Sequence, residues 1–347
     1  MFSKNLKYYR LRNSMTKREL AIRLNITPMA ISNYENGKRK PDMELLKKMA
    51  NVLGVRVSDF LAVRNENLQF VHGEFRKNST LSIAQQEYVR ESVEEYFNRF
   101  MTIVEILGGD VLPDAPATNI LKLSWDSEDD AQLLRSHLNL AIDGPIYNLT
   151  EILENKGILI YTCQIDNDKF SGMSGFVNER PYIVFNKNMT PERKRSTIVH
   201  ELSHLMFKWT KDMEYRKIEE HANAISGAFL FPKTDALREL GIHRTNISKD
   251  MQLVAKEYGI SMYLLIKRAQ LLNIISENLA KKFYIYASSI GWRKNEPTRI
   301  NDERPTLFEQ LVYRAVNEKE ISMQRGAELL KVPYDEIVSR CCFMEEE

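Results

Sequence analysis

Residues 190–209 read TPERKRSTIVHELSHLMFKW and predict one helix with two histidines a single turn apart. Because His200 and His204 stand at i and i+4, both imidazoles can reach one divalent metal ion. Glu201 lies at the same edge and can take a proton from an attacking water. Apolar residues cover the remaining surface, which indicates that the helix is largely buried.

The two histidines alone are also compatible with ordinary core or surface positions. A third ligand on a following helix would favour a metal site. Residues 218–232, IEEHANAISGAFLFP, predict a following helix on which Glu219, Glu220 and His221 are all candidate ligands. If Glu219 faces the metal, small residues share its face, Asn223 among them, and allow two helices to approach closely. Two histidines and one glutamate leave a fourth position open, as in catalytic zinc sites. The same ligands also suit Mn²⁺.

Charge is unevenly spread along the 347 residues. Residues 1–61 hold 13 Lys and Arg against 5 Asp and Glu, a net charge of +8, whereas the remainder carries −6. A basic head on a mildly acidic body indicates a domain that binds polyanions. A solvated basic surface would produce the same charge pattern.

Capping signals divide this basic head into short consecutive helices. They are the capping box of Thr16 and Glu19, the cap Thr27 followed by Pro28, the stop at Asn36-Gly37, the stop at Gly54, and a core closed by Phe60 and Leu61. Two short helices joined by a tight turn are the geometry in which the second helix lies in the DNA major groove.

The stretch TKRELAIRLNITPMAISNYENGKRKPDMELLKKMANVLGV, with I-S-N-Y-E-N-G-K-R-K-P inside it, resembles the phage-repressor-like (XRE family) helix-turn-helix domains. The resemblance implies DNA binding through the recognition-helix residues Pro28, Met29, Ser32 and Asn33, and through Lys17, Asn36, Lys38 and Lys40 near phosphates. Asn33 can contact adenine in bidentate fashion, and Met29 can touch a thymine methyl. A domain that only docks a protein partner or dimerises is the alternative.

A second resemblance rests on HELSHLMF, the following E-x-x-A-N and F-L-F-P elements, and the upstream segment SGMSGFVNERPYIVFN. Together they resemble the ImmA/IrrE metallopeptidase family over about residues 75–275. The resemblance implies one Zn²⁺ per chain held by His200, His204 and Glu219, with Glu201 as catalytic base. It also implies a protein substrate, typically a repressor of the phage type. Candidates for the oxyanion stabiliser, by residue type only, are His221, His243 and Tyr215.

The pattern along the chain predicts a mainly α fold with a small β-sheet (α+β). Its expected parts are an all-α helix-turn-helix domain at 1–61, a linker at 62–80 with one short strand, a zincin-like metallopeptidase domain at 81–275, and a helical region at 276–347. The longest predicted helix runs from about 83 to 107, and its aromatic stripe is interpreted as core.

These features favour a DNA-binding zinc endopeptidase that cleaves a phage-type repressor and so relieves repression in a mobile element, a stress response or a toxin–antitoxin-like locus. Self-cleavage in the linker and a homodimer are compatible with the same features. The alternative is a transcriptional regulator whose zinc domain is a sensor without turnover. Three cysteines, no secretory signal and no apolar run of about 18 residues favour a cytoplasmic protein without a membrane span.

Overall fold

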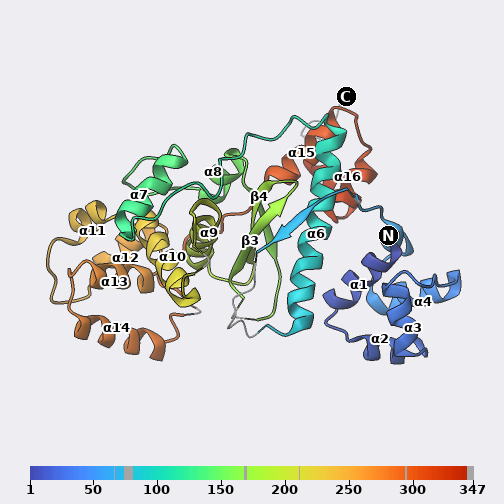
Figure 1. Cartoon of the computed structure of the whole chain (residues 1–347), viewed down its shortest axis with the longest axis horizontal. Helices are drawn as coiled ribbons and strands as arrows, with labels where there is room; N and C mark the ends of the chain where they lie inside the picture. The colour runs from blue at the N-terminus through green and yellow to red at the C-terminus, as the bar shows by residue number, and fades with distance from the viewer. Residues whose placement is uncertain (66, 74–80, 168–169, 211, 294, 342–347) are drawn as a thin grey trace. The chain divides into compact units, whose positions relative to one another are not determined.

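The computed structural model describes residues 1–65, 67–73, 81–167, 170–210, 212–293 and 295–341. It is mainly helical with one small mixed sheet, which confirms the expected α+β class (Figure 1). The chain divides into two compact units, and these cut it differently from the four expected parts. Residues 74–80 of the expected linker and Cys342 lie outside the described residues.

The first unit contains the helix-turn-helix segment, one long helix and the C-terminal helices. Its helices are α1 (Phe2–Arg12), α2 (Lys17–Leu24), α3 (Pro28–Glu35), α4 (Met43–Leu53), α5 (Val57–Leu61), α6 (Ile83–Ile106), α15 (Leu307–Asn317, with Leu307 itself in the second unit), α16 (Met323–Leu330) and α17 (Tyr334–Cys341).

The capping signals of the basic head are confirmed. Thr16 and Glu19 form the capping box of α2, and the Thr27 hydroxyl accepts the Ala30 amide at the start of α3. Leu61 is 56% exposed, which corrects the expectation that it closes the core. Since α5 is little more than one turn long, it directs only Phe60 inward.

Helix α6 packs against α1 and, through its aromatic stripe, against α15. The ring of Phe308 lies 5.3 Å from that of Tyr96 and 5.4 Å from that of Phe100. The stripe is therefore core, as expected, but its partners come from both ends of the chain. This packing explains why the C-terminal helices belong to the first unit.

The second unit contains the sheet and the helices around it. Its elements are β1 (Phe70–His72, with Phe70 itself in the first unit), α7 (Ser127–His137), α8 (Leu149–Asn155), β2 (Leu159–Cys163), β3 (Gly172–Val177), β4 (Arg180–Asn186), α9 (Pro191–Met206), α10 (Tyr215–Leu230), α11 (Lys233–Leu240), α12 (Asp250–Glu257), α13 (Met262–Leu271) and α14 (Glu277–Ser289).

The strand order is β1-β3-β4-β2, with β2 parallel and β3 antiparallel to β4. A two-residue turn joins β3 to β4, and both its residues, Asn178 and Glu179, have positive φ. That conformation matches the twist of a hairpin. Helix α9 packs on β3 and β4, and α10 packs on α9 (Figure 1). The buried face of α9 thus lies between the sheet and a second helix.

The segment before α15 is tied to the start of α9 by polar contacts. Glu192, which is fully buried, accepts the Ile300 amide at 2.9 Å. Lys194 pairs with Asp302 at 2.6 Å, and Arg195 pairs with Glu303. Glu192, Lys194 and Arg195 in the first turns of α9 are therefore buried and anchor this helix, whereas Arg193 is exposed.

The same segment gives a pH-dependent contribution to stability through Glu154, whose carboxylate accepts the Thr306 amide at 2.9 Å. Burial raises the pKa of Glu154 to about 7, and the hydrogen bonds from Thr306 and Leu307 oppose that rise. The folded state therefore binds this proton more tightly than the unfolded state, so stability falls as pH rises toward 7. Relative to Glu154→Gln, the wild type should lose about 2–3 kcal/mol between pH 4.5 and 7.

Denaturant unfolding of both chains at several pH values measures this difference. Glu320→Gln, an exposed glutamate that does not contribute to the pKa of Glu154, serves as the control. Parallel pH profiles for wild type and Glu154→Gln would rule the contribution out.

Candidate metal centre and nucleic-acid interface

The two histidines of α9 point toward one place. Their Nε2 atoms lie 3.1 Å apart, and the ring centroids lie 4.7 Å apart at 74°. His200 is buried, whereas His204 keeps 23% of its side chain exposed. Because residues four apart on a helix lie one above the other, this convergence follows directly from the spacing.

Helix α10 supplies the third group of the cluster. Glu219 Oε2 lies 3.5 Å from His200 Nε2, and Glu219 Oε1 lies 3.3 Å from His204 Nε2. All three candidate ligand atoms lie within 4.8 Å of one another. Two imidazole nitrogens and one carboxylate at this separation fit a divalent cation such as Zn²⁺, with a fourth position left for a further ligand.

The two neighbours of Glu219 on the chain point elsewhere. Glu220 is exposed and pairs with Arg216 at 2.8 Å. His221 Nε2 lies 2.7 Å from an oxygen of the fully buried Asp130. Of the three adjacent candidate ligands, the fold therefore brings only Glu219 to the histidines.

Small residues allow α9 and α10 to approach closely. Ala222 is fully buried, and the Ser226 hydroxyl donates to the Ser196 carbonyl on α9 at 2.8 Å. Asn223, one helical turn after Glu219 on α10, is exposed. The two helices consequently pack through the buried Ala and Ser positions.

Glu201 is buried beside the cluster, and strand β3 holds its carboxylate. The Ser174 hydroxyl donates to Glu201 Oε2 at 3.0 Å. Close packing here requires Gly172, because a Cβ at that position would lie 2.6 Å from Thr197 Cγ2 and 3.4 Å from Glu201 Cγ. Ser174 was not identified from the sequence. The small residues of SGMSGF, on a strand that packs against the helix of His200 and His204, are the signal that could have found it.

Aromatic rings extend outward from the metal cluster. The ring centroid of Trp209 lies 5.4 Å from that of His204 and 6.3 Å from that of His221. The ring of His221 also lies beside that of Trp125, with the centroids 4.8 Å apart. Among the three expected oxyanion candidates, His221 lies in this row, whereas His243 is exposed after α11. Tyr215 is half-buried at the first position of α10.

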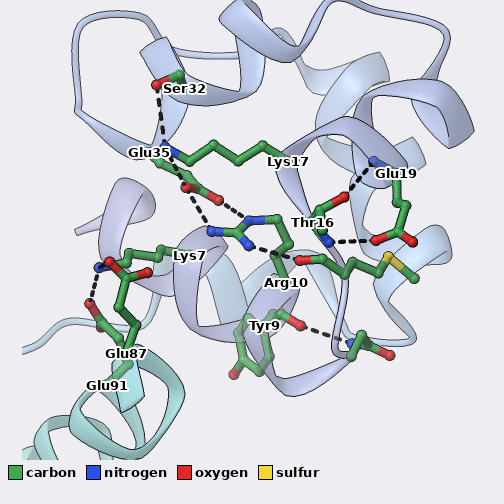
Figure 2. A network of polar contacts seen from close by, with 12 residues as sticks. Lys7, Tyr9, Arg10, Thr16, Lys17, Glu19, Ser32, Glu35, Glu87 and Glu91 are labelled. Carbon is green, nitrogen blue, oxygen red and sulfur yellow. Dashed lines mark hydrogen bonds and ion pairs between the residues drawn. The ribbon is translucent and has the colours of Figure 1, made fainter. Parts of the chain in front are cut away.

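The helix-turn-helix segment is organised around a buried ion pair (Figure 2). Arg10 on α1 meets Glu35 on α3 through two contacts, Nε to Oε1 at 2.5 Å and Nη2 to Oε2 at 3.0 Å. Lys17 on α2 reaches the same carboxylate at 3.6 Å and donates to the Ser32 hydroxyl at 3.3 Å. Glu35 therefore has a structural role, because it holds α3 against α1 and α2.

The residues expected to contact DNA lie on α2, on α3 and in the loop after α3. Pro28 and Met29 are exposed at the start of α3, Ser32 and Asn33 are half-buried along it, Lys17 is half-buried at the start of α2, and Asn36, Lys38 and Lys40 are exposed in the loop. Not every cation of the basic head is equally available, because Lys4 and Lys7 pair with glutamates of α6.

Two family models match this chain, one over the helix-turn-helix segment and one over the domain that contains the His-His-Glu cluster. Residues 6–60 match the family model described as helix-turn-helix, and residues 153–270 match the M78 peptidase model described as IrrE N-terminal-like domain. The chain belongs to the helix-turn-helix family and carries an IrrE N-terminal-like domain. The second match contains the metal cluster and Glu201.

Three similar proteins are named as HTH-type transcriptional regulators. YqaE of Bacillus subtilis is 36% identical over 77 residues, covering 22% of this chain and 66% of YqaE. YonR, derived from the SPbeta prophage of the same species, is 37% identical over 70 residues, covering 20% of this chain and 63% of YonR. MJ0272 of Methanocaldococcus jannaschii is 33% identical over 61 residues, covering 18% of this chain and 92% of MJ0272. The chain thus spans less than two thirds of YqaE and YonR.

A matched pair of variants on α10 tests whether Glu219 is a metal ligand. Glu219→Ala should abolish stoichiometric Zn²⁺ binding, because only two ligands remain. Glu220→Ala, one residue away and exposed, should bind metal like the wild type. Metal content after equilibrium dialysis measures both chains. Equal loss in the two variants, or retention in both, would contradict the assignment of Glu219.

None of the helices in the described part of the chain combines the length and apolar character that a bilayer crossing requires.

Proposed function

We propose that this chain is a DNA-binding metallopeptidase that cleaves a phage-type transcriptional repressor and so relieves repression. The observation that supports this most is the convergence of His200, His204 and Glu219 beside a buried Glu201 within an IrrE N-terminal-like domain. Joined to a helix-turn-helix domain, such a peptidase would act where repressors are bound. Binding to DNA would also place the chain in the cytoplasm.

The residues of the domain have separate roles in this proposal. His200, His204 and Glu219 would hold a Zn²⁺ ion, which would polarise the peptide carbonyl when bound. Glu201 takes a proton from the attacking water and passes it to the leaving amine. Because Ser174 donates to Oε2, we assign the proton transfer to Oε1. The Ser174 hydroxyl also orients the carboxylate for that transfer.

The test is incubation of the full chain, loaded with Zn²⁺, with purified phage-type repressors from the same genome. Discrete fragments by intact mass are expected, and they locate the scissile bond. Intact repressor after prolonged incubation, with one Zn²⁺ bound per chain, would favour the second candidate function.

That second candidate is a transcriptional regulator in which the metal domain binds a partner or senses a signal without turnover. The names of the similar proteins support it, since YqaE, YonR and MJ0272 are all called transcriptional regulators. Operator binding by both the wild type and Glu201→Gln, with no proteolysis of the repressor by either chain, would favour this candidate over the first proposal.

If the loop after α3 contacts DNA phosphates, its lysines should contribute to the salt dependence of DNA affinity. Lys38→Ala and Lys40→Ala should each weaken binding to duplex DNA of any sequence and lower the slope of log K against log salt by about 0.9. Lys282→Ala, exposed on α14, is the control. Fluorescence anisotropy with a random-sequence duplex over a range of salt measures the slopes. Unchanged slopes in both lysine variants would place the phosphate contacts elsewhere.

A further inference from the structure

Strand β1 lies at one edge of the sheet and pairs with β3 (Figure 1). It comes from the expected linker, yet Val71–Gly73 belongs to the compact unit that contains the metal cluster, whereas Met1–Phe70 belongs to the other unit. Three linker residues are thus incorporated into the IrrE-like unit. Their position is informative because a sheet edge is a template for an added extended peptide.

The contacts between β1 and β3 are close and specific. The Gly73 amide donates to the Ser174 carbonyl at 2.8 Å. A Cβ on Gly73 would lie 2.4 Å from that carbonyl oxygen, and a Cβ on Gly175 would lie 2.4 Å from the Val71 carbonyl oxygen. Gly73 lies against Ser174, and Val71, two residues earlier, lies against Gly175, one residue later. The two strands therefore run antiparallel. Two glycines are therefore needed for this pairing.

A side-chain contact fixes β1 further. His72 Nδ1 lies 2.7 Å from the hydroxyl of Tyr182, a fully buried residue of β4. The hydrogen bond reaches across β3 to the next strand of the sheet. It identifies His72 as a specific anchor of the linker segment.

The strand also meets the residue that holds the catalytic base. Ser174 accepts the Gly73 amide through its carbonyl and donates to Glu201 through its hydroxyl. One residue therefore separates the linker strand from Glu201. An extended peptide that reached this base along the sheet edge would need the same backbone groups of β3.

We propose that the edge of β3 is the strand on which this domain takes an extended peptide, and that Val71–Gly73 occupies it as a built-in blocking strand. This inference rests on the proposed peptidase function and adds its regulation. The blocking strand is short, and the Val71 side chain is 63% exposed, so it is suited to displacement. Because it is tethered, it competes at an effective concentration in the millimolar range, about that of a short flexible linker.

Gly73→Ala tests the blocking strand in the full chain, since the added Cβ has no room beside the Ser174 carbonyl. In a Glu201→Gln background, which removes cleavage, we expect the amides of β3 to exchange about tenfold faster or more. A labelled peptide of residues 67–76, NLQFVHGEFR, should then bind about tenfold more tightly or better. Val63→Ala, an exposed change elsewhere in the linker, should alter neither quantity.

Tyr182→Phe provides a second route, because it removes the hydroxyl that bonds His72 without altering the linker. It should shift exchange and peptide affinity in the same direction by a smaller factor. Unchanged exchange and unchanged affinity in both variants would overturn the proposal. Cleavage of wild type within residues 70–80, absent in Glu201→Gln, would also overturn it, because the segment would then be a substrate.

The outcome separates this inference from the proposed function. With Glu201 intact, Gly73→Ala should cleave repressor several-fold faster than the wild type. If peptide binding and exchange rise as expected and neither chain cleaves a repressor, the peptidase proposal fails while the peptide-binding edge stands.

Discussion

Replacing Glu201 by Gln is expected to slow cleavage of the repressor by about 10²–10⁴-fold, the usual contribution of a general base. The amide keeps the size of the carboxylate and can still accept the Ser174 hydroxyl, but it cannot take up the proton of the attacking water. The metal ligands are untouched, so the variant should bind Zn²⁺ at the same stoichiometry. Single-turnover cleavage, followed by intact mass, measures the rate.

The control for this experiment is Glu220→Gln, an exposed glutamate near the cluster on α10. It should cleave at the wild-type rate. Comparable rates in wild type and Glu201→Gln would show that Glu201 is not the base. If Glu201→Gln loses both cleavage and bound metal, Glu201 is needed to maintain the metal site and is not shown to be the base.

Replacing Glu35 by Ala is expected to destabilise the helix-turn-helix segment by about 3–5 kcal/mol, because Arg10 would remain buried without its carboxylate. Both side chains are almost fully buried, and the two charges meet through a bidentate contact. The loss should appear first where α3 is held against α1. Hydrogen exchange of the α3 amides in the full chain measures it.

A matched exposed pair gives the control for Glu35. Glu44 and Lys48 form an i,i+4 pair on the surface of α4, so Glu44→Ala should cost about 0.5 kcal/mol or less. A double variant, Arg10→Met with Glu35→Leu, should recover much of the stability because no charge is left unpaired. Exchange in Glu35→Ala that matches the Glu44→Ala variant would show that the buried pair is dispensable.

Local signals determined most of what the sequence predicted correctly. The capping box at Thr16, the cap at Thr27 and the stop at Gly54 each act within a few residues, so they place α2, α3 and α4 without knowledge of the fold. The spacing of His200 and His204 fixes their common direction for the same reason. These features depend on backbone geometry over one or two turns.

Partners distant in the chain were outside the reach of such signals. Lys194 and Arg195 are both buried against residues more than 100 positions away, and no local pattern indicates these partners. Helix α6 shows its apolar stripe clearly, but nothing local indicates that Phe308 covers it. Leu61 was misplaced because one turn of helix offers several faces and only packing selects which of them is buried.

The sequence by itself determined the two domain types, the main helices and the ligand types of the metal site. Only the tertiary structure decided that Glu219 rather than Glu220 or His221 joins the histidines, that Ser174 holds Glu201, and that a linker strand lies on the edge of β3. The physical reason is the distance along the chain over which each kind of interaction acts. Capping and helical periodicity act between near neighbours, whereas the choice among adjacent candidate ligands depends on how separate elements pack.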